Sequence, residues 1–228
     1  MSCKIGGYPA ERKGIEIETP RPGCEARVLD LWCVAALETL VDARELLRAD
    51  NPPDPPYWAL PWIGARAIAA RLLDSPPATG ASVLEIGCGL GLAGVAAGLG
   101  GASVMFSDYV PAALEFARAN AELNGLRSYE TRLIDFTRGR LGRRFDLVVA
   151  ADVVYEPRSY EPLVAFLDEH VVAGGGRVLL TESLRADAKR VLAMLTERGF
   201  ALETTTVWVP EAGKLERTWL HTLERTKR

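Results

Sequence analysis

The sequence predicts an α/β fold in which a mostly parallel sheet ends in an antiparallel hairpin. From residue 81 onward, apolar runs of strand length alternate with longer segments of helical period, and the last two apolar runs have no helix between them. Strands joined through helices lie parallel, whereas two strands without an intervening helix pair antiparallel. The composition agrees, since 48% apolar and 25% charged residues in 228 are typical of a globular chain with its own core.

The beginning of the chain differs from the rest in its pattern. Residues 1–28 are polar and interrupted by glycine and proline, which indicates an irregular arm. Residues 29–49 carry apolar side chains at helical spacing and predict an amphipathic helix that ends at a proline cluster. The apolar positions are Leu29, Trp32, Ala36, Leu40, Ala43 and Leu47. We therefore expect an N-terminal helical extension over 1–56 and a main domain over 57–228.

The main domain begins with an aromatic segment at 57–62 and a helix at 64–74. Glycine, proline and asparagine separate the elements that follow. The predicted strands are 82–86, 103–107, 130–134, 145–150, 177–181, 201–209 and 217–224. The predicted helices are 91–99, 111–124, 159–172 and 185–198. Seven strands of this spacing, with four helices among them, are typical of an open α/β sheet.

One charge-free stretch, 86–107, has 22 residues, which is the length of a membrane span. Seven of these residues are glycine, and the stretch starts with a turn-like glycine cluster. This pattern indicates a strand, a loop, a helix and a second strand rather than one long apolar helix. We therefore expect no association with a membrane.

Charge and cysteine content exclude several other classes of protein. The 27 basic and 30 acidic residues give a net charge of −3, without the basic excess of a nucleic-acid-binding domain. The four cysteines contain no CxxC pair, and with only two histidines they offer no zinc-ligand spacing, so no metal is expected. Unpaired thiols and the lack of a signal peptide predict a cytoplasmic location.

A glycine-rich loop follows the first predicted strand of the main domain, in the sequence Val83-Leu-Glu-Ile-Gly-Cys-Gly-Leu-Gly91. Glycine allows the backbone to pass close to a ligand, because it has no Cβ. Asp108 lies 21 residues after Gly87, at the end of the next strand, where a carboxylate can accept hydrogen bonds from ribose hydroxyls. The loop and this acid together predict a site for an adenosine nucleoside.

The loop also contains a GxGxxG pattern at 89–94, the fingerprint of dinucleotide-binding proteins. In those proteins the first glycine directly follows the strand, and here that residue is Gly87. Counted from Gly87, the third glycine position holds Leu92. This register disfavours a nicotinamide-dependent oxidoreductase, and Glu85 at the end of a buried strand suits a ligand that carries a positive or hydrogen-donating group.

These residues resemble a known family. Glu85-x-Gly87-x-Gly89-x-Gly91 resembles motif I of the class I S-adenosylmethionine-dependent methyltransferases, whose Rossmann-like seven-stranded sheet ends in an antiparallel hairpin. Ala151-Asp-Val-Val-Tyr155 resembles the D-x-x-Y motif of the seven-strand lysine methyltransferases, methyltransferase family 16. The aromatic segment at 57–64 is most similar to the subgroup that acts on the electron transfer flavoprotein β subunit. Asp135-Phe136 stands where many members have Asp-Trp.

The resemblance implies a cofactor, S-adenosylmethionine, which becomes S-adenosylhomocysteine. It implies cofactor contacts from Trp62, Glu85, Gly87, Cys88, Gly89, Gly91, Asp108, Tyr109, Asp135, Phe136 and Ala151. The glycines would hold the methionine part, and Asp135 and Phe136 would border the adenine. Tyr109 either covers the adenine or is simply an exposed aromatic residue.

The implied reaction is methyl transfer to the side chain of a lysine in a protein. Asp152 is expected to hold and orient the amine, and Tyr155 to form a wall of the pocket and offer its hydroxyl. Alternatively, Asp152 caps the following turn and Tyr155 is a core residue. A small-molecule amine remains open as acceptor, and a non-catalytic adenosine-binding protein is a further alternative. His170 and His221 are assigned to structure.

Overall fold

The computed structural model describes residues 3–18, 26–37, 56–182 and 188–226. Its main feature is a seven-stranded sheet in the order β6-β5-β4-β7-β8-β10-β9. The strands are β4 (Ser82–Ile86), β5 (Ser103–Asp108), β6 (Tyr129–Leu133), β7 (Leu147–Ala151), β8 (Arg177–Glu182), β9 (Phe200–Glu211) and β10 (Lys214–Arg225). The first five are parallel, and β10 is antiparallel to both β8 and β9. The predicted sheet and its terminal hairpin are therefore confirmed.

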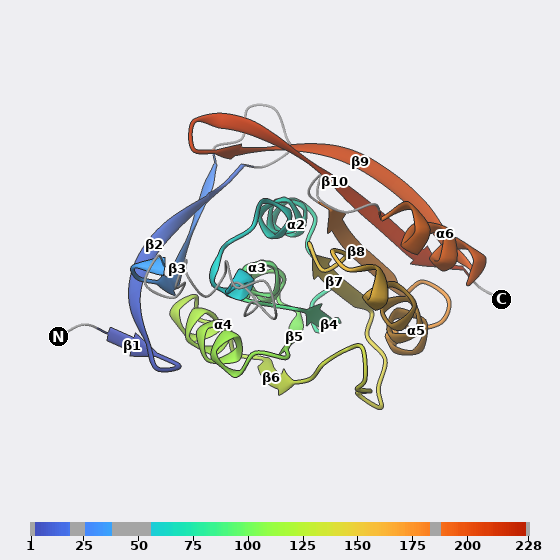
Figure 1. Ribbon diagram of the computed structural model, residues 1–228, viewed down its shortest axis with the longest axis horizontal. Coiled ribbons are helices and arrows are strands. Elements are labelled where there is room, and N and C mark those ends of the chain that lie inside the picture. The colour runs from blue at the N-terminus through green and yellow to red at the C-terminus, as the bar shows by residue number, and fades with distance from the viewer. Residues whose placement is uncertain (1–2, 19–25, 38–55, 183–187, 227–228) are drawn as a thin grey trace, which may run out of the picture.

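Helices cover both faces of this sheet, as Figure 1 shows. The helices are α2 (Ile63–Asp74), α3 (Leu92–Leu99), α4 (Pro111–Leu123), α5 (Tyr160–His170) and α6 (Lys189–Glu197). The buried side chains of α2, α3 and α4 belong to one apolar cluster, and those of α5 and α6 belong to the other. The central strands β4 and β7 are mostly apolar because both of their faces are buried, and Glu85 is the buried acid of β4.

The N-terminal segment forms a second, antiparallel sheet with the order β1-β2-β3. Its strands are β1 (Cys3–Ile5), β2 (Tyr8–Ile17) and β3 (Arg27–Val34). The helix predicted over 29–49 is therefore wrong at its start, where β3 lies, and residues 38–49 are outside the described residues. The buried side chains of Leu29, Leu31 and Cys33 alternate with more exposed ones, which is the period of a strand.

This segment is extended because it pairs with β2 over its whole length, and Asn120 on α4 adds contacts to its backbone. Its Oδ1 accepts a hydrogen bond from Trp32 N at 2.6 Å, and its Nδ2 donates to the carbonyl oxygens of Trp32 at 3.1 Å and Leu90 at 2.8 Å. The side chain is fully buried and pairs with β3 as a neighbouring strand would. The same amide also joins the N-terminal sheet to the glycine loop, since Leu90 lies in that loop.

The long β9–β10 hairpin reaches across the molecule to the N-terminal sheet (Figure 1). Arg66 of α2 links the three parts. Its Nη1 forms an ion pair with Glu211 of the hairpin at 2.7 Å, and its Nη2 donates to the carbonyl oxygen of Glu16 in β2 at 3.1 Å. The N-terminal sheet, α2 and the hairpin are thus joined beside the segment that carries the predicted aromatic residues.

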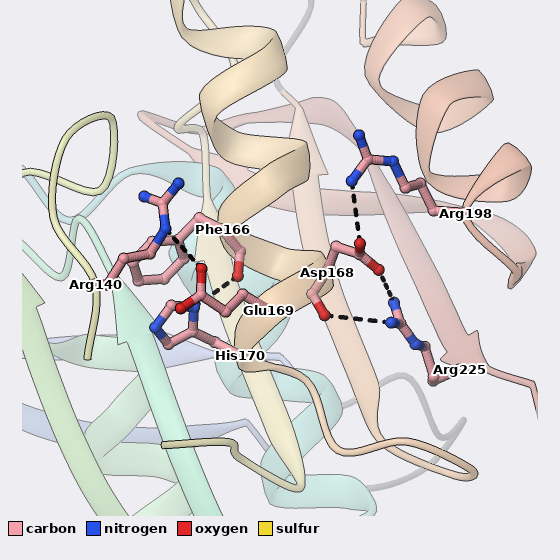
Figure 2. Close-up of polar contacts among 7 residues, drawn as sticks. All are labelled: Arg140, Phe166, Asp168, Glu169, His170, Arg198 and Arg225. Carbon is pink, nitrogen blue, oxygen red and sulfur yellow. Dashed lines mark hydrogen bonds and ion pairs between the residues drawn. The ribbon is translucent and has the colours of Figure 1, made fainter. Parts of the chain in front are cut away.

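Polar contacts attach the end of α5 to its surroundings, as Figure 2 shows. Asp168 forms ion pairs with Arg198 of α6 and Arg225 of β10. The ring of His170 is fully buried and stacks on Phe166. Its Nε2 accepts a hydrogen bond from Leu141 N at 2.8 Å, and its Nδ1 lies 2.8 Å from the carbonyl oxygen of Phe166. His170 therefore has the structural role that was predicted.

The charge-free stretch 86–107 runs from the end of β4 through the glycine loop and α3 into β5, as its pattern predicted. Within the described ranges, no helix combines the length and the apolar character that a bilayer crossing requires.

Candidate active site

A pocket of about 500 Å³ opens at the carboxyl ends of β4, β5, β7 and β8. The chain leaves β4 toward β5 on one side and leaves β7 toward β8 on the other, so that β4 and β7 flank a switch point in the strand order. Open α/β sheets bind ligands at such a point, because the connecting loops diverge there and leave a crevice. The volume is in the range of small-molecule sites, which is about 300–1,000 Å³.

The glycine loop forms the floor of this pocket. Gly87, Gly89 and Gly91 have φ values of +58°, +50° and +77°, which side chains with a Cβ rarely adopt. A Cβ on Gly89 would lie 2.7 Å from the carbonyl oxygen of Trp58, so the aromatic segment packs directly on the loop. Gly87 and Gly89 line the pocket, whereas Gly91 precedes α3 and packs against Phe106 behind the loop.

Two buried acids support the loop. Asp108 accepts hydrogen bonds from Gly89 N at 3.0 Å and from Val110 N at 2.9 Å, which turn its carboxylate toward the loop. Glu85 accepts a hydrogen bond from Gly94 N at 2.9 Å. Burial raises the pKa of Glu85 to about 8, despite this hydrogen bond, and burial also raises the pKa of Asp108.

Cys88 and Ala151 line the pocket as well, in accord with their predicted positions. Burial raises the pKa of the Cys88 thiol, so it stays protonated at neutral pH and is a poor nucleophile. Ala151 is the last residue of β7 and is half-buried beside the pocket.

Aromatic side chains form the rim. The Tyr57 ring lies 5.9 Å from that of Trp62 and 6.3 Å from that of Tyr155, measured between centroids. Trp62 Nε1 donates a hydrogen bond to the carbonyl oxygen of Tyr57 at 2.7 Å. Tyr155 is 52% exposed, so the alternative in which it is a core residue is wrong. Tyr109 is both exposed and part of the pocket wall.

Of the two residues predicted to border the adenine, Asp135 and Phe136, only Phe136 lines the pocket. Phe136 contributes to the wall, and its ring meets Phe166 of the core at 6.3 Å between centroids. Asp135 does not line the pocket, because its Oδ1 accepts hydrogen bonds from the backbone and hydroxyl of Thr137 at 2.9 and 2.6 Å.

Asp152 lies just after β7, with a positive φ of 53°, and its carboxylate reaches the first turn of α2. Gly64 N donates a hydrogen bond to its Oδ2 at 3.2 Å, so Asp152 contacts a helix start that is 88 residues away. A Cβ on Gly64 would come within 2.4 Å of both this oxygen and Thr181 Oγ1. The positive end of the α2 dipole favours the ionised form of Asp152.

The charge of the pocket is one-sided. Its lining carboxyl groups belong to Glu85, Asp108, Asp152, Glu156 and Glu182, and none of the described lining residues is lysine, arginine or histidine. Glu182 was not predicted from the sequence, although it is the last residue of a buried strand, as Asp108 is. Trp58 was interpreted as a packing residue; it contacts Tyr8 and Phe116 and also lines the pocket.

Comparison with known proteins assigns the chain to a family. The model of a family described as lysine methyltransferase matches residues 62–198, which is more than half of the chain.

The chain belongs to the lysine methyltransferase family.

The curated relatives and solved structures agree with this assignment. Residues of this chain are 36% identical to the electron transfer flavoprotein beta subunit lysine methyltransferase of Xenopus laevis, over 58% of this chain and 54% of that protein. They are 33% identical to the protein N-lysine methyltransferase METTL21A of Danio rerio, over 52% of this chain and 57% of that protein. The chain spans about half the length of the curated relatives it matches.

Among solved structures, the TehB-like SAM-dependent methyltransferase of Corynebacterium glutamicum aligns with a TM-score of 0.56. The two chains are 24% identical, and the alignment covers 71% of this chain and 88% of that one. This likeness shows the Rossmann-like methyltransferase fold. The cofactor of the family is S-adenosylmethionine.

Proposed function

We propose that the protein transfers a methyl group from S-adenosylmethionine to the side-chain amine of a lysine in another protein. The observation that supports this best is the charge of the pocket, in which each charged lining residue described is acidic. The methyl donor carries a positive sulfonium and the acceptor a positive ammonium. Opposite charges that lie within a few ångströms attract strongly where water is partly excluded.

The residues present suit the cofactor. A Cβ at Gly87 would come 3.1 Å from Val153, and at Gly89 it would meet Trp58, so close packing requires glycine at both positions. The backbone of both residues borders the pocket, where a ligand can approach it closely. Asp108 is held by two backbone N–H groups at a strand end, where its carboxylate can accept hydrogen bonds from ribose hydroxyls. When bound, S-adenosylmethionine supplies a methyl group that its sulfonium has already activated.

The acceptor side needs an amine without its extra proton, because a lysine with a reference pKa of about 10.4 is protonated at neutral pH. Asp152 would attract the ammonium and orient the amine toward the methyl donor, and the released proton would pass to water. The carbon–sulfur bond of the methyl group would break as the carbon–nitrogen bond forms, so that S-adenosylhomocysteine leaves. Tyr155 and Tyr57 border the opening and align the aliphatic part of the lysine. The chain thus supplies position and charge rather than a covalent intermediate.

The names of the relatives suggest which acceptors to test first. One is named for the electron transfer flavoprotein beta subunit, and another is named as a protein N-lysine methyltransferase. We propose the beta subunit of electron transfer flavoprotein as the first candidate acceptor, with a lysine side chain as the methylated group.

Incubation of the pure protein with a radiolabelled methyl donor tests this proposal. The acceptors are the purified flavoprotein beta subunit and, separately, a cell lysate that contains both proteins and small molecules. We expect label in a protein band and methylated lysine after hydrolysis of that band. Label confined to the small-molecule fraction would show a small-molecule methyltransferase instead. Binding of S-adenosylhomocysteine without any transfer would indicate an adenosine-binding protein that lacks catalysis.

A further inference from the structure

Glu182 is a second acid beside Asp152 at the acceptor end of the pocket. It is the last residue of β8, lines the pocket and is only 9% exposed. One carboxylate oxygen, Oε2, accepts a hydrogen bond from Ala188 N at 2.8 Å. The other, Oε1, lies 3.6 Å from His221 Nε2, which is longer than a hydrogen bond.

The sheet register brings the two acids together. Ala151 of β7 pairs with Thr181 of β8 in parallel, and Asp152 N donates a hydrogen bond to the carbonyl oxygen of Thr181 at 3.2 Å. Asp152 directly follows Ala151, and Glu182 directly follows Thr181. They therefore leave neighbouring strands side by side at the same edge of the sheet.

Among the described residues, His221 is the one basic side chain that forms an ion-pair contact with Glu182. His221 is 3% exposed, and burial lowers its pKa while the nearby Glu182 opposes that shift. The imidazole is therefore neutral at neutral pH. Its Nδ1 lies 2.9 Å from Thr204 Oγ1, and its Nε2 has no hydrogen-bond partner among the described residues. Thr181 Oγ1 is likewise buried without a partner in that part of the chain.

A carboxylate with so little exposure is costly unless a positive group or several donors satisfy it. In the described part of the chain, Glu182 receives one backbone N–H and faces a neutral ring, while its side chain lines the pocket, where a positive ligand group can reach it. We propose that Glu182 binds the ammonium of the methyl acceptor together with Asp152, so that the amine is held between two carboxylates. This inference rests on the proposed methyl transfer to an amine.

The carboxylates of Asp152 and Glu182 accept hydrogen bonds from different parts of the fold. Asp152 is held by the first turn of α2, through Gly64 N. Glu182 is held by Ala188 N, at the start of the segment that leads into α6, and is backed by His221 of β10. The acceptor site is therefore built at the neighbouring ends of β7 and β8, and the C-terminal hairpin contributes to it through His221.

A pair of cofactor analogues tests the proposal without knowledge of the acceptor. Both are adenosylmethionine analogues in which nitrogen replaces the sulfonium and carries a four-carbon arm directed at the acceptor side. In one analogue the arm ends in an ammonium group, and in the other it ends in a methyl group. The ratio of their dissociation constants, measured by calorimetry, isolates the contribution of the terminal charge.

We expect Glu182→Gln to weaken the ammonium-armed analogue about tenfold or more, the usual scale for a charge-assisted contact in a partly closed site. The methyl-armed analogue should change less than about twofold. Glu203→Gln, on the exposed edge strand β9, removes the same charge outside the pocket and should alter neither affinity. An unchanged ratio in folded Glu182→Gln overturns the proposal.

Two results keep this inference separate from the proposed function. If neither analogue binds the wild-type protein, the assignment of the pocket as the methyl-donor site is wrong. If both bind, a crystal structure of the wild-type complex decides the role of Glu182 even where its variant fails to fold. An arm nitrogen within hydrogen-bond distance of a Glu182 carboxylate oxygen supports the proposal, and a nitrogen that points away from Glu182 contradicts it.

Discussion

The sequence offered two positions for the Asp152 side chain, in the ligand pocket or as a cap of local structure, and the carboxylate contacts both a helix start and the pocket. Its carboxylate caps a helix, but that helix is α2 rather than the turn that follows it, and the same carboxylate lines the pocket. Its positive φ of 53° is tolerated by aspartate and asparagine better than by most residues. Asparagine in its place therefore keeps the backbone, an oxygen acceptor and the side-chain shape.

Asp152→Asn should leave cofactor affinity nearly unchanged and reduce methyl transfer by about 100-fold or more, the scale expected for a positioned proton-handling group. Isothermal calorimetry with S-adenosylhomocysteine and single-turnover transfer measure the two effects separately. Asp146→Asn is a matched control, because it makes the same substitution at the amino end of the sheet, away from the pocket. There the Asp146 carboxylate accepts a hydrogen bond from Ser82 N at 2.8 Å. Joint loss of cofactor binding and thermal stability in Asp152→Asn would leave Asp152 with the capping role alone.

Glu85 links folding stability to pH. Burial raises its pKa from the ordinary value of about 4.5 to about 8, so the folded protein keeps a proton that the unfolded chain releases. The stabilisation is complete below about pH 4.5 and is lost as pH rises toward 8, at up to about 1.4 kcal/mol per pH unit.

Glu85→Gln should remove this dependence, since glutamine keeps the shape and the acceptor for Gly94 N but does not titrate. Urea unfolding between pH 5 and 9 gives the free energy of unfolding of both proteins. We expect the variant to gain stability relative to wild type with rising pH, and the difference to level off above about pH 8. Parallel curves for the two proteins would show that Glu85 ionises normally in the fold.

At the scale of elements, α2 connects the pocket to the rest of the fold. Its first turn binds Asp152, its Arg66 binds the hairpin and β2, and the aromatic segment immediately precedes it. The close approach of α2 to the strand ends depends on Gly64, because a Cβ there would meet Asp152 and Thr181 at 2.4 Å.

Gly64→Ala should destabilise the protein by about 1–3 kcal/mol, the usual cost of overpacking, and should also displace Asp152 and lower methyl transfer. Gly98→Ala in α3 provides the control. Its Cβ would come 2.4 Å from the Leu126 side chain, so the collision is of the same size but lies outside the pocket. Thermal melts and transfer rates of both variants should show reduced stability in each and reduced transfer in Gly64→Ala alone. Equal transfer by the two variants would contradict the role of Gly64.

For the whole molecule, the arrangement of charge decides which ligands enter. The pocket lies at the switch point of the sheet and presents five acids in its described lining, without a basic residue there. A dinucleotide would bring a negatively charged pyrophosphate to this surface, whereas a methionine-linked nucleoside brings a cation.

S-adenosylmethionine, which carries this cation, should therefore stabilise the folded protein, and NAD should not. A ligand at 100 times its dissociation constant adds about 2.7 kcal/mol. In a chain of this size each kcal/mol raises the melting temperature by about 2–4 °C. Differential scanning fluorimetry with both ligands measures the shifts. Stabilisation by NAD alone would overturn the assignment of the cofactor.

Local patterns determined most of the main domain. The alternation of apolar runs, the glycines after β4 and the missing helix between β9 and β10 lie within short windows, where period and turn chemistry act directly. The same windows located Glu85, Asp108 and Asp152, because each follows a buried strand of the parallel sheet and such strand ends meet at one edge.

The tertiary structure decided the remainder. The segment from 29 to 34 fits the periods of both helix and strand, and its extended form is stabilised by pairing with β2 and by Asn120, which is 88 residues away from Trp32. Glu182 gained a role only when β8 was placed beside β7 and His221 behind it. A short window encodes periodicity and loop chemistry, whereas strand order and contacts between distant residues depend on how all the elements pack together.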